Sequence, residues 1–413
     1  MGFKLPFNPL NNLLYKQGPK KVSMDISQIR QHFEEQYGSG QAPINLYYAP
    51  GRVNLIGEHT DYNGGYVLPC TLDYGTYLAV RKGDNHRVAL TSTAFDYAPV
   101  IPAGQIHQKH GNHWVNYPLG VIDQLKKMGS EVSTGLELMF SGTIPHGAGL
   151  SSSASIEMVT AVALNDMFSL GHSPIDLIRL SQRAENEFVG IQCGIMDQFA
   201  VGMGRSDHAV FLDTENLNYE LIPVKLSDYQ LIISNTNKQR KLTDSKYNER
   251  RSECEKALEY LNQGSDGFTN LGKIECERFL DIQERIPDPV LRRRARHVVS
   301  EDKRVLSATE ALRSGDLTTL GRLMNESHDS LRDDYEVTGR ELDTLVEEAR
   351  KIGGVLGSRM TGAGFGGCTV SLVHEDRTDE FVKQVGRGYR FATGLKADFY
   401  TTKTGDSPRK ISH

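Results

Sequence analysis

A glycine- and serine-rich loop, Gly142 to Ser155, constrains the fold of this 413-residue chain more than any other segment. It reads G-T-I-P-H-G-A-G-L-S-S-S-A-S and continues into an apolar pattern that predicts a largely buried helix over 155–170. Glycine lets the backbone approach a ligand closely, and the unpaired N–H groups of a helix N-terminus attract anions. The segment therefore predicts a phosphate-binding loop; the alternative is a glycine-rich loop that only caps a core helix.

A second segment, 49–61, gathers charged side chains just after a strand-like stretch. It reads A-P-G-R-V-N-L-I-G-E-H-T-D, so Arg52, Glu58, His59 and Asp61 fall within ten positions in a turn-rich setting. Carboxylates accept hydrogen bonds from sugar hydroxyls, whereas Arg and His donate them. The pattern indicates a site for a polyhydroxylated ligand, and the alternative is a solvated loop with incidental ion pairs.

Two acids follow in a third segment, Glu185 on a helix predicted over 175–189 and Asp197 in C-G-I-M-D-Q-F-A. Asp197 stands among apolar neighbours, where a carboxylate needs a cationic or hydrogen-bonding partner. It is therefore a candidate functional carboxylate. The alternative is an Asp that caps a helix running on from Gln198.

A fourth segment, 359–367, reads R-M-T-G-A-G-F-G-G and precedes a strand-like stretch over 368–373. Its four glycines indicate a second place where the backbone approaches a ligand closely. A plain glycine-rich turn between a helix and a strand would have the same composition.

Taken together, these segments resemble the GHMP kinase superfamily, and within it the galactokinase family. G-R-V-N-L-I-G-E-H-T-D-Y (51–62) is similar to the galactokinase signature, P-H-G-A-G-L-S-S-S-A-S (145–155) to the ATP loop, and M-T-G-A-G-F-G-G-C (360–368) to the third motif. The resemblance implies an α+β, two-domain GHMP kinase fold. An N-terminal mixed-sheet α/β domain and a C-terminal ferredoxin-like domain would hold the active site between them.

The same resemblance implies ATP-dependent phosphorylation of galactose at its anomeric hydroxyl, which gives galactose 1-phosphate and ADP and is the first committed step of galactose use. Asp197 and Arg52 would form the catalytic pair, and Mg²⁺ would bind Ser152 and Glu185, with the serine register open by one residue. The sugar would lie among Glu58, His59, Asp61, Gly194 and Tyr247. The nucleotide would contact Trp114, Tyr117, Gly147, Ala148, Gly149, Leu150, Ser151, Ser152 and Ser153.

Other functions stay open at this point. A kinase of a related sugar, N-acetylgalactosamine or arabinose, would differ mainly in details of the pocket. A non-catalytic galactose sensor would belong to another functional class, although Arg52 and Asp197 favour an enzyme. A Walker-type NTPase is excluded, because no G-x-x-x-x-G-K-[ST] occurs in the sequence.

Composition excludes several classes of partner. The chain has 47 basic and 52 acidic residues, a net charge of −5, which argues against nucleic acid, and the Arg292–Arg296 cluster is interpreted as a solvated helix face. No apolar run approaches the ~20 residues that span a bilayer, which argues against a membrane partner. The five cysteines are widely spaced and indicate reduced thiols. We expect a cytoplasmic monomer that binds galactose and ATP.

Length and pattern also predict how the chain divides. A single core usually stops growing at about 250–300 residues, so 413 residues favour two domains. The glycine-rich segment 202–207 is the predicted boundary, which gives domains over 24–206 and 207–413. Helices are expected over 26–37 and 302–314. Residues 1–23 carry four lysines and no acid and are expected to be a disordered extension.

Overall fold

The structure is a computed structural model that describes residues 25–83, 86–132, 135–145, 148–238, 243–264 and 266–411, with the backbone alone for 243–245. The predicted extension 1–23 lies outside the described residues. The helices are α2 (Ile26–Tyr37), α3 (Asn116–Lys127), α4 (Ser152–Met167), α5 (Pro174–Arg183), α6 (Met196–Met203), α7 (Thr243–Leu261), α8 (Cys276–Ile282), α9 (Pro289–Ser314), α10 (Leu317–Ser330), α11 (Arg340–Arg350) and α12 (Thr378–Thr393).

The strands form three sheets. They are β1 (Asn45–Asn54), β2 (Tyr66–Val67), β3 (Pro69–Gly83), β4 (Arg87–Ser92), β5 (Val100–Pro102), β6 (Gly135–Gly142), β7 (His208–Asp213), β8 (Tyr219–Pro223), β9 (Tyr229–Asn235), β10 (Val355–Thr361), β11 (Cys368–His374), β12 (Asp398–Thr402) and β13 (Arg409–Lys410). Their orders are β13-β1-β3-β6-β4-β5, β10-β11-β9-β12 and β2-β7-β8.

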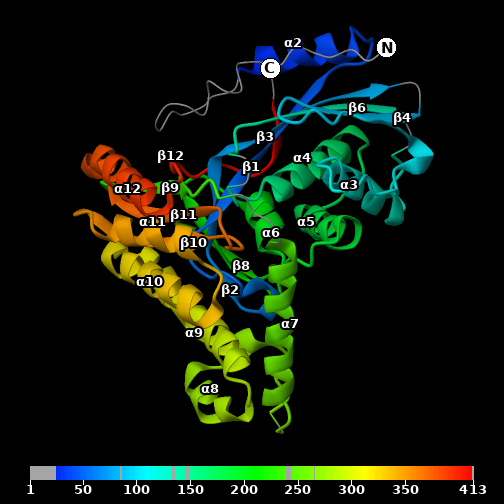
Figure 1. Cartoon of the computed structure of the whole chain (residues 1–413). Helices are drawn as coiled ribbons and strands as arrows, with labels where there is room; N and C mark the ends of the chain where they lie inside the picture. The colour runs from blue at the N-terminus through cyan, green and yellow to red at the C-terminus, as the bar shows by residue number, and fades with distance from the viewer. Residues whose placement is uncertain are drawn as a thin grey trace.

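The first sheet is mixed. Strands β4 and β6 pair in parallel, whereas all other neighbouring strands of this sheet are antiparallel. Helix α2 covers one face, where Ile29 and Phe33 pack on Leu46, Ala79 and Met139. Helices α3 to α6 gather on the other face, and α4 contacts both β1 and β3 (Figure 1). This is the N-terminal mixed-sheet domain that the sequence predicted.

The second sheet is antiparallel throughout and carries α11 and α12 against β10 and β11. Buried Leu345 of α11, Phe381 and Tyr389 of α12 and Ile232 of β9 share one core. On the opposite side, Ile233 and Val370 pack into a cluster that also contains Val53 and Leu55, so the two main sheets share a core. Helices α7, α8 and α9 form the narrow lower end of the molecule (Figure 1). The chain thus has a mixed-sheet part and an antiparallel-sheet part.

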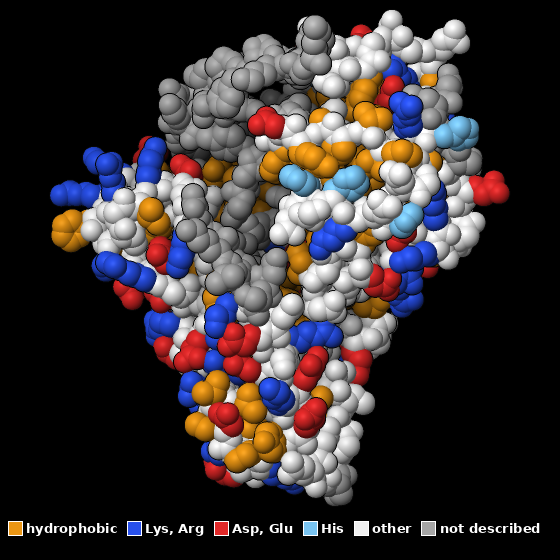
Figure 2. All heavy atoms as spheres, turned by 45° about the vertical axis from the view of Figure 1, so that its right-hand side comes forward, with side chains coloured by type: hydrophobic (Ala, Val, Ile, Leu, Met, Phe, Trp, Pro, Cys, Tyr) orange, Lys and Arg blue, Asp and Glu red, His pale blue; other side chains and the backbone are white. Residues whose placement is uncertain are grey.

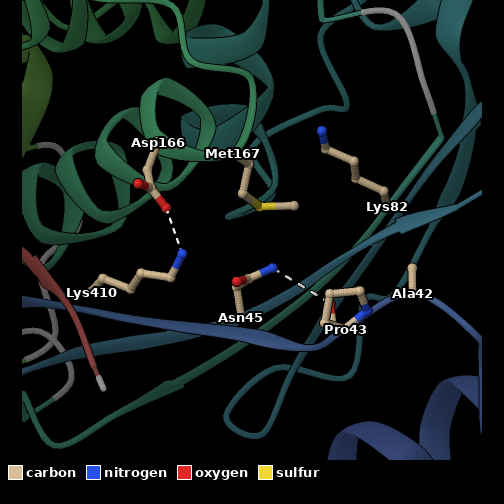
Figure 3. A pocket seen from close by; sticks show the side chains of 7 residues that line it. All are labelled: Ala42, Pro43, Asn45, Lys82, Asp166, Met167 and Lys410. Carbon is tan, nitrogen blue, oxygen red and sulfur yellow. Dashed lines mark hydrogen bonds and ion pairs between the residues drawn. The ribbon is translucent and has the colours of Figure 1, made fainter. Parts of the chain in front are cut away.

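The chain crosses between its two halves more than once. The predicted boundary at 206/207 falls between α6 and β7, yet β7 pairs with β2 of the first half. Strand β13 returns to pair with β1, through Lys410 opposite Tyr47. Lys410 Nζ also lies 2.8 Å from Asp166 Oδ2 at the end of α4 (Figure 3). The same carboxylate accepts a 2.5 Å hydrogen bond from the Tyr47 hydroxyl, so β13 is attached to both the sheet and its helical layer.

The predicted helices are present, with three differences. The predicted 302–314 helix is only the last part of α9, which begins at Pro289. Helix α4 begins three residues before the predicted 155–170 segment, because Ser152 already belongs to it. The predicted 175–189 helix is interrupted: α5 ends at Arg183 and continues as a π-helical turn, Ala184–Val189. The extra residue per turn of a π-helix changes which side chains face inward, which is why such turns often occur at functional sites.

The interpretation of Arg292–Arg296 as a solvated face is wrong for one member. Helix α9 begins at Pro289, so the basic cluster lies on its first turns. Arg294 is buried and bridges Glu253 of α7 and Glu336, with nitrogen–oxygen distances of 2.8 and 2.5 Å. It joins two helices because its neighbours supply the acids that a buried guanidinium needs.

Both signs of charge are interspersed over the face drawn in Figure 2. No helix among the described residues is sufficiently long and apolar to cross a membrane. All five cysteines are free thiols.

Candidate active site

Arg52 and Asp197, the predicted catalytic pair, are in direct contact. Arg52 Nε and Nη2 lie 2.8 and 2.6 Å from Asp197 Oδ1. The second carboxylate oxygen accepts a 2.6 Å hydrogen bond from the Ser151 hydroxyl. Asp197 is partly exposed and lies in the first turn of α6, whose N-cap is Ile195. The alternative role of Asp197 as a helix cap is therefore excluded.

The arginine is held in place by the phosphate loop. The β1–β3 register shifts between Pro50 and Arg52, which bends the strand at Gly51. A Cβ at Gly51 would lie 2.8 Å from the Leu150 carbonyl oxygen, so only glycine allows this approach. The backbone N–H of Arg52 donates to Leu150 O, and its Nη1 donates to Gly149 O at 2.8 Å. Strand β1 is thus attached to Gly149 and Leu150, just before α4.

The predicted phosphate loop leads into an uncapped helix. Gly149 and Ser151 have φ values of 74° and 57°, and no side chain caps the N-terminus of α4. Its first N–H groups are therefore available to an anion. Ala148, Leu150 and Ser151 are buried, whereas Gly147 lies outside the described residues.

The third motif reaches the same loop. It connects β10 to β11, and a Cβ at Gly362 would lie 3.0 Å from the Gly149 carbonyl oxygen. Gly362, Gly364, Gly366 and Gly367 all have positive φ, a backbone conformation that glycine adopts without strain. The sequence prediction of a second close backbone approach is consistent with this geometry, since two glycine-rich loops meet beside Arg52.

Asp61 and Gly194, two predicted sugar residues, lie against one another. A Cβ at Gly194 would lie 2.0 Å from Asp61 Oδ2, so no other residue fits without movement. Asp61 Oδ2 also accepts from the backbone N–H of Met196 at 3.3 Å. Burial, with a smaller contribution from nearby Asp197, raises the pKa of Asp61 to about 6. Both residues line a cavity of 440 Å³ together with Tyr62 and Cys193.

An aromatic group borders this cavity. His59 has a φ of 64°, and its Nδ1 lies 2.7 Å from the Tyr62 hydroxyl. The rings of His59 and Tyr62 lie 5.5 and 5.2 Å from the Tyr247 ring, centroid to centroid. Burial, reinforced by the charge of neighbouring His297, lowers the pKa of His59 to about 3, so its imidazole is neutral at pH 7. The predicted sugar residues His59, Asp61, Gly194 and Tyr247 are thus brought together.

Glu58 has a different environment. Its Oε2 lies 2.5 Å from Arg359 Nη2 and accepts from Asn54 Nδ2 at 2.9 Å. Its Oε1 accepts from the backbone N–H of Gly362 and the hydroxyl of Thr361, at 2.8 and 3.2 Å. Both Glu58 and Arg359 are fully buried. Glu58 therefore fixes the loop that carries His59 and Asp61 to the third motif, and its contact with a sugar hydroxyl stays a prediction.

Glu185, the predicted metal ligand, lies in the π-helical turn after α5 and is nearly buried. Burial raises its pKa to about 7, with a further contribution from the negative charge of Asp197. The hydroxyl of Ser153, one residue after the predicted Ser152, acts against this shift and lowers the pKa of Glu185. The predicted metal ligand Ser152, and the alternative Ser153 that the open register allows, stay predictions.

A serine hydroxyl and a carboxylate fit magnesium, which binds proteins through about one or two carboxylates and takes its other ligands from phosphate and water. A cation beside Glu185 would also offset the burial that disfavours its charged form. Among the described residues, no three His, Cys, Asp or Glu side chains converge to hold a metal by themselves. The donor set therefore suits a metal that arrives with a nucleotide.

The predicted adenine residues lie at the start of α3. Trp114 is only 8% exposed and its Nε1 donates to the Tyr97 carbonyl oxygen at 3.0 Å. Phe95, which the sequence reasoning missed, stacks on the Trp114 ring at 6.1 Å between centroids and is 42% exposed. Tyr117 is partly exposed one turn further on. The accessible aromatic face is thus that of Phe95, and contact of Trp114 or Tyr117 with adenine stays a prediction.

The comparisons with known proteins agree with this geometry. The family description "Galactokinase galactose-binding signature" matches residues 31–82, "GHMP kinases N terminal domain" matches 116–205, and "GHMP kinases C terminal" matches 308–390. The chain is 50% identical to the galactokinase of Clostridium acetobutylicum over 370 residues, which covers 89% of this chain and 95% of that protein. It is 46% identical to the galactokinase of Lactiplantibacillus plantarum over 390 residues, which covers 94% of this chain and 100% of that protein.

Solved structures give the same result. The Lactococcus lactis galactokinase complexed with galactose superposes with a TM-score of 0.91 at 44% identity, and the match covers 94% of this chain and 100% of that one. The Methanococcus jannaschii mevalonate kinase shares the fold, with a TM-score of 0.64 at 20% identity over 89% of this chain and 100% of that one. The chain is therefore a phosphotransferase and belongs to the galactokinase family of GHMP kinases.

Proposed function

We propose that this chain phosphorylates galactose at its anomeric hydroxyl, with ATP as the phosphoryl donor. One observation carries the proposal: Asp197, Arg52 and Ser151 meet where the sugar signature joins the phosphate loop. An acceptor hydroxyl beside Asp197 would lie between the Asp61 cavity and the uncapped end of α4. That arrangement suits transfer from a nucleotide phosphate to a sugar oxygen.

The proposed chemistry follows from the transition state. Phosphoryl transfer passes through a loose transition state, so the protein mainly positions the reactants and stabilises charge. Asp197 Oδ2 accepts the proton of the attacking hydroxyl as the new bond to the γ-phosphorus forms. The bond from that phosphorus to the bridging oxygen breaks at the same time, and ADP leaves. Arg52 stays bound to Asp197 Oδ1 and stabilises the ionised carboxylate before the proton moves. The N–H groups at the start of α4 bind the phosphate oxygens.

We propose that Ser153 and Glu185 hold Mg²⁺ with the nucleotide. When bound, this ion would offset the negative charge of the nucleotide phosphates. Glu185 would supply one carboxylate oxygen to the ion, and the hydroxyl of Ser153, whose influence lowers the pKa of Glu185, would supply a second oxygen. The nucleotide is thereby oriented against the α4 N-terminus.

We also propose that the chain works as a cytoplasmic monomer in which the parts before and after residue 206 enclose the substrates. The five free thiols are consistent with a reducing compartment. Light scattering coupled to gel filtration tests the oligomeric state, and a particle mass near twice 46.0 kDa would overturn the monomer.

The sugar assignment predicts that galactose is phosphorylated far more efficiently than glucose, its epimer at one hydroxyl. Asp61 lines the cavity and His59 is buried next to it in the sequence signature, and a desolvated group left without its hydroxyl partner lowers efficiency by roughly tenfold to a hundredfold. A coupled assay of ADP release gives kcat/KM for each sugar. N-acetylgalactosamine and arabinose are measured in the same series, and equal efficiency on glucose, or higher efficiency on either relative, would reject the assignment.

The metal assignment predicts the behaviour of Glu185→Gln. This change keeps shape but removes the charge, so we expect activity to fall about tenfold to a hundredfold and to recover partly at high Mg²⁺. Galactose affinity, measured by calorimetry, should stay unchanged. Wild-type dependence on Mg²⁺ would make Glu185 a structural residue.

A further inference from the structure

Two buried acids share one glutamine amide beneath the proposed metal site. Glu157 of α4 and Gln198 of α6 have no exposed surface, and Gln198 directly follows Asp197. Gln198 Nε2 lies 3.0 Å from Glu157 Oε2 and 2.6 Å from Glu185 Oε2. The amide therefore connects a deeply buried acid to the acid that faces the nucleotide.

The hydrogen bonds determine how this amide is oriented. An amide nitrogen has two hydrogens, and both are used here by carboxylate oxygens. Within the part of the chain that the structure describes, neither Gln198 Oε1 nor Glu157 Oε1 has a hydrogen-bond partner. Turning the amide over would point its oxygen at the Glu185 carboxylate, which is unfavourable. The orientation is thus set by the acids alone.

Glu157 has no direct use in phosphoryl transfer. It lies in the first half of α4, behind the loop that begins the helix, and burial raises its pKa well above the usual value, with Glu185 as the next contribution. A neutral Glu157 accepts the Gln198 hydrogen bond without adding a second negative charge beside Glu185. Its role is therefore geometrical.

We propose that Glu157 and Gln198 are positioning residues that hold the Glu185 carboxylate toward Ser153 and the nucleotide. This inference rests on the proposed function, because it requires Glu185 to bind Mg²⁺. Neither residue touches a substrate. Hydrogen-bond partners behind a metal ligand orient it, and their loss typically costs about tenfold to a hundredfold in metal affinity.

The test uses variants of the full-length chain and Mg²⁺ with ADP as the probe. Glu157→Met and Gln198→Met each remove one connection while keeping an unbranched apolar side chain of similar size. Calorimetry gives the affinity for ADP with and without Mg²⁺, and the ratio of the two affinities is the Mg²⁺ effect. For each variant we expect this ratio to be about tenfold to a hundredfold smaller than in the wild type. KM for galactose should not change. The double variant should be no worse than the more affected single variant, since both act through one chain of hydrogen bonds.

A conservative variant and a matched control separate positioning from simple destabilisation. Glu157→Gln keeps an acceptor for the Gln198 amide and is neutral, so it should restore the Mg²⁺ effect that Glu157→Met loses. Thr160→Val lies on the same helix, is equally buried, and breaks only a hydrogen bond to Ile156 O within α4. It should leave the Mg²⁺ effect intact.

The outcomes decide between the two proposals. If Glu185→Gln loses the Mg²⁺ effect but folded Glu157→Met and Gln198→Met keep it, positioning is rejected while the metal role stands. If Glu185→Gln keeps the Mg²⁺ effect, Glu185 is not the metal ligand. The positioning proposal, which depends on that role, is then rejected with it. Loss in Glu157→Gln equal to that in Glu157→Met would also reject positioning. If Glu157→Met does not fold, the Mg²⁺ effect measured on Gln198→Met decides whether positioning is accepted or rejected.

Discussion

Asp197→Asn is expected to lower turnover by ~10²-fold or more while the affinities for galactose and nucleotide stay nearly unchanged. Asparagine keeps the volume and one oxygen, which can still accept from Arg52, and its amide can donate to the Ser151 hydroxyl. The geometry around the residue is therefore preserved. What is lost is an atom that accepts the proton of the attacking hydroxyl.

Turnover and calorimetric binding of both substrates are measured on the same purified variant. Asp197→Ala is less informative, because it also leaves Arg52 without its counter-charge in a nearly buried position. The matched control is Asp166→Asn at the far end of α4, where the carboxylate likewise accepts from two side chains, Tyr47 and Lys410. Its turnover should equal that of the wild type. Wild-type turnover in Asp197→Asn would instead show that Asp197 is not the general base.

The second large effect is expected on stability rather than rate. Arg359→Met should lower the free energy of unfolding by about 3–5 kcal/mol, the usual cost of leaving one member of a buried ion pair uncompensated. Arg359 is completely buried, lies 2.5 Å from Glu58 and 3.8 Å from Glu301, and donates to the Ser327 hydroxyl. Each of these groups loses a donor at once. Urea denaturation followed by circular dichroism gives the difference.

Two comparisons make this measurement specific. Arg322→Met removes an exposed arginine paired with Glu326 on α10, and such pairs contribute about 0–1 kcal/mol. Adding Glu58→Gln to Arg359→Met should recover part of the loss, because the stranded charge is then removed as well. A loss in Arg359→Met no larger than that in Arg322→Met would contradict a stabilising role for the buried pair.

The sequence predicted what depends on local pattern. The loop before α4 is recognisable because glycines, serines and an apolar helix follow one another along the chain, and the structure has φ values there that match. Arg52, Asp61 and Asp197 were predicted from the resemblance of short motifs, and they converge. The family and its kinase activity are confirmed by the comparisons.

The missed features depend on partners distant in sequence. Nothing near Glu58 reveals that Arg359 neutralises it, and nothing near Arg294 reveals Glu253 and Glu336. Glu157 gave one usable signal, an acid inside the apolar pattern of α4, which a search for unpaired buried charges would have detected. Its partner Gln198 could not be predicted without the packing of α4 against α6.

Strand β13 has a consequence for how this protein is made. Ribosomes synthesise β1 and β3 early, yet β13, which pairs with Tyr47 and Tyr48 on the outer edge of β1, comes near the end of the described chain. Through most of translation that edge is open, with backbone N–H and C=O groups able to pair with another nascent strand. We therefore expect crowded expression and slow release to favour aggregation of this chain.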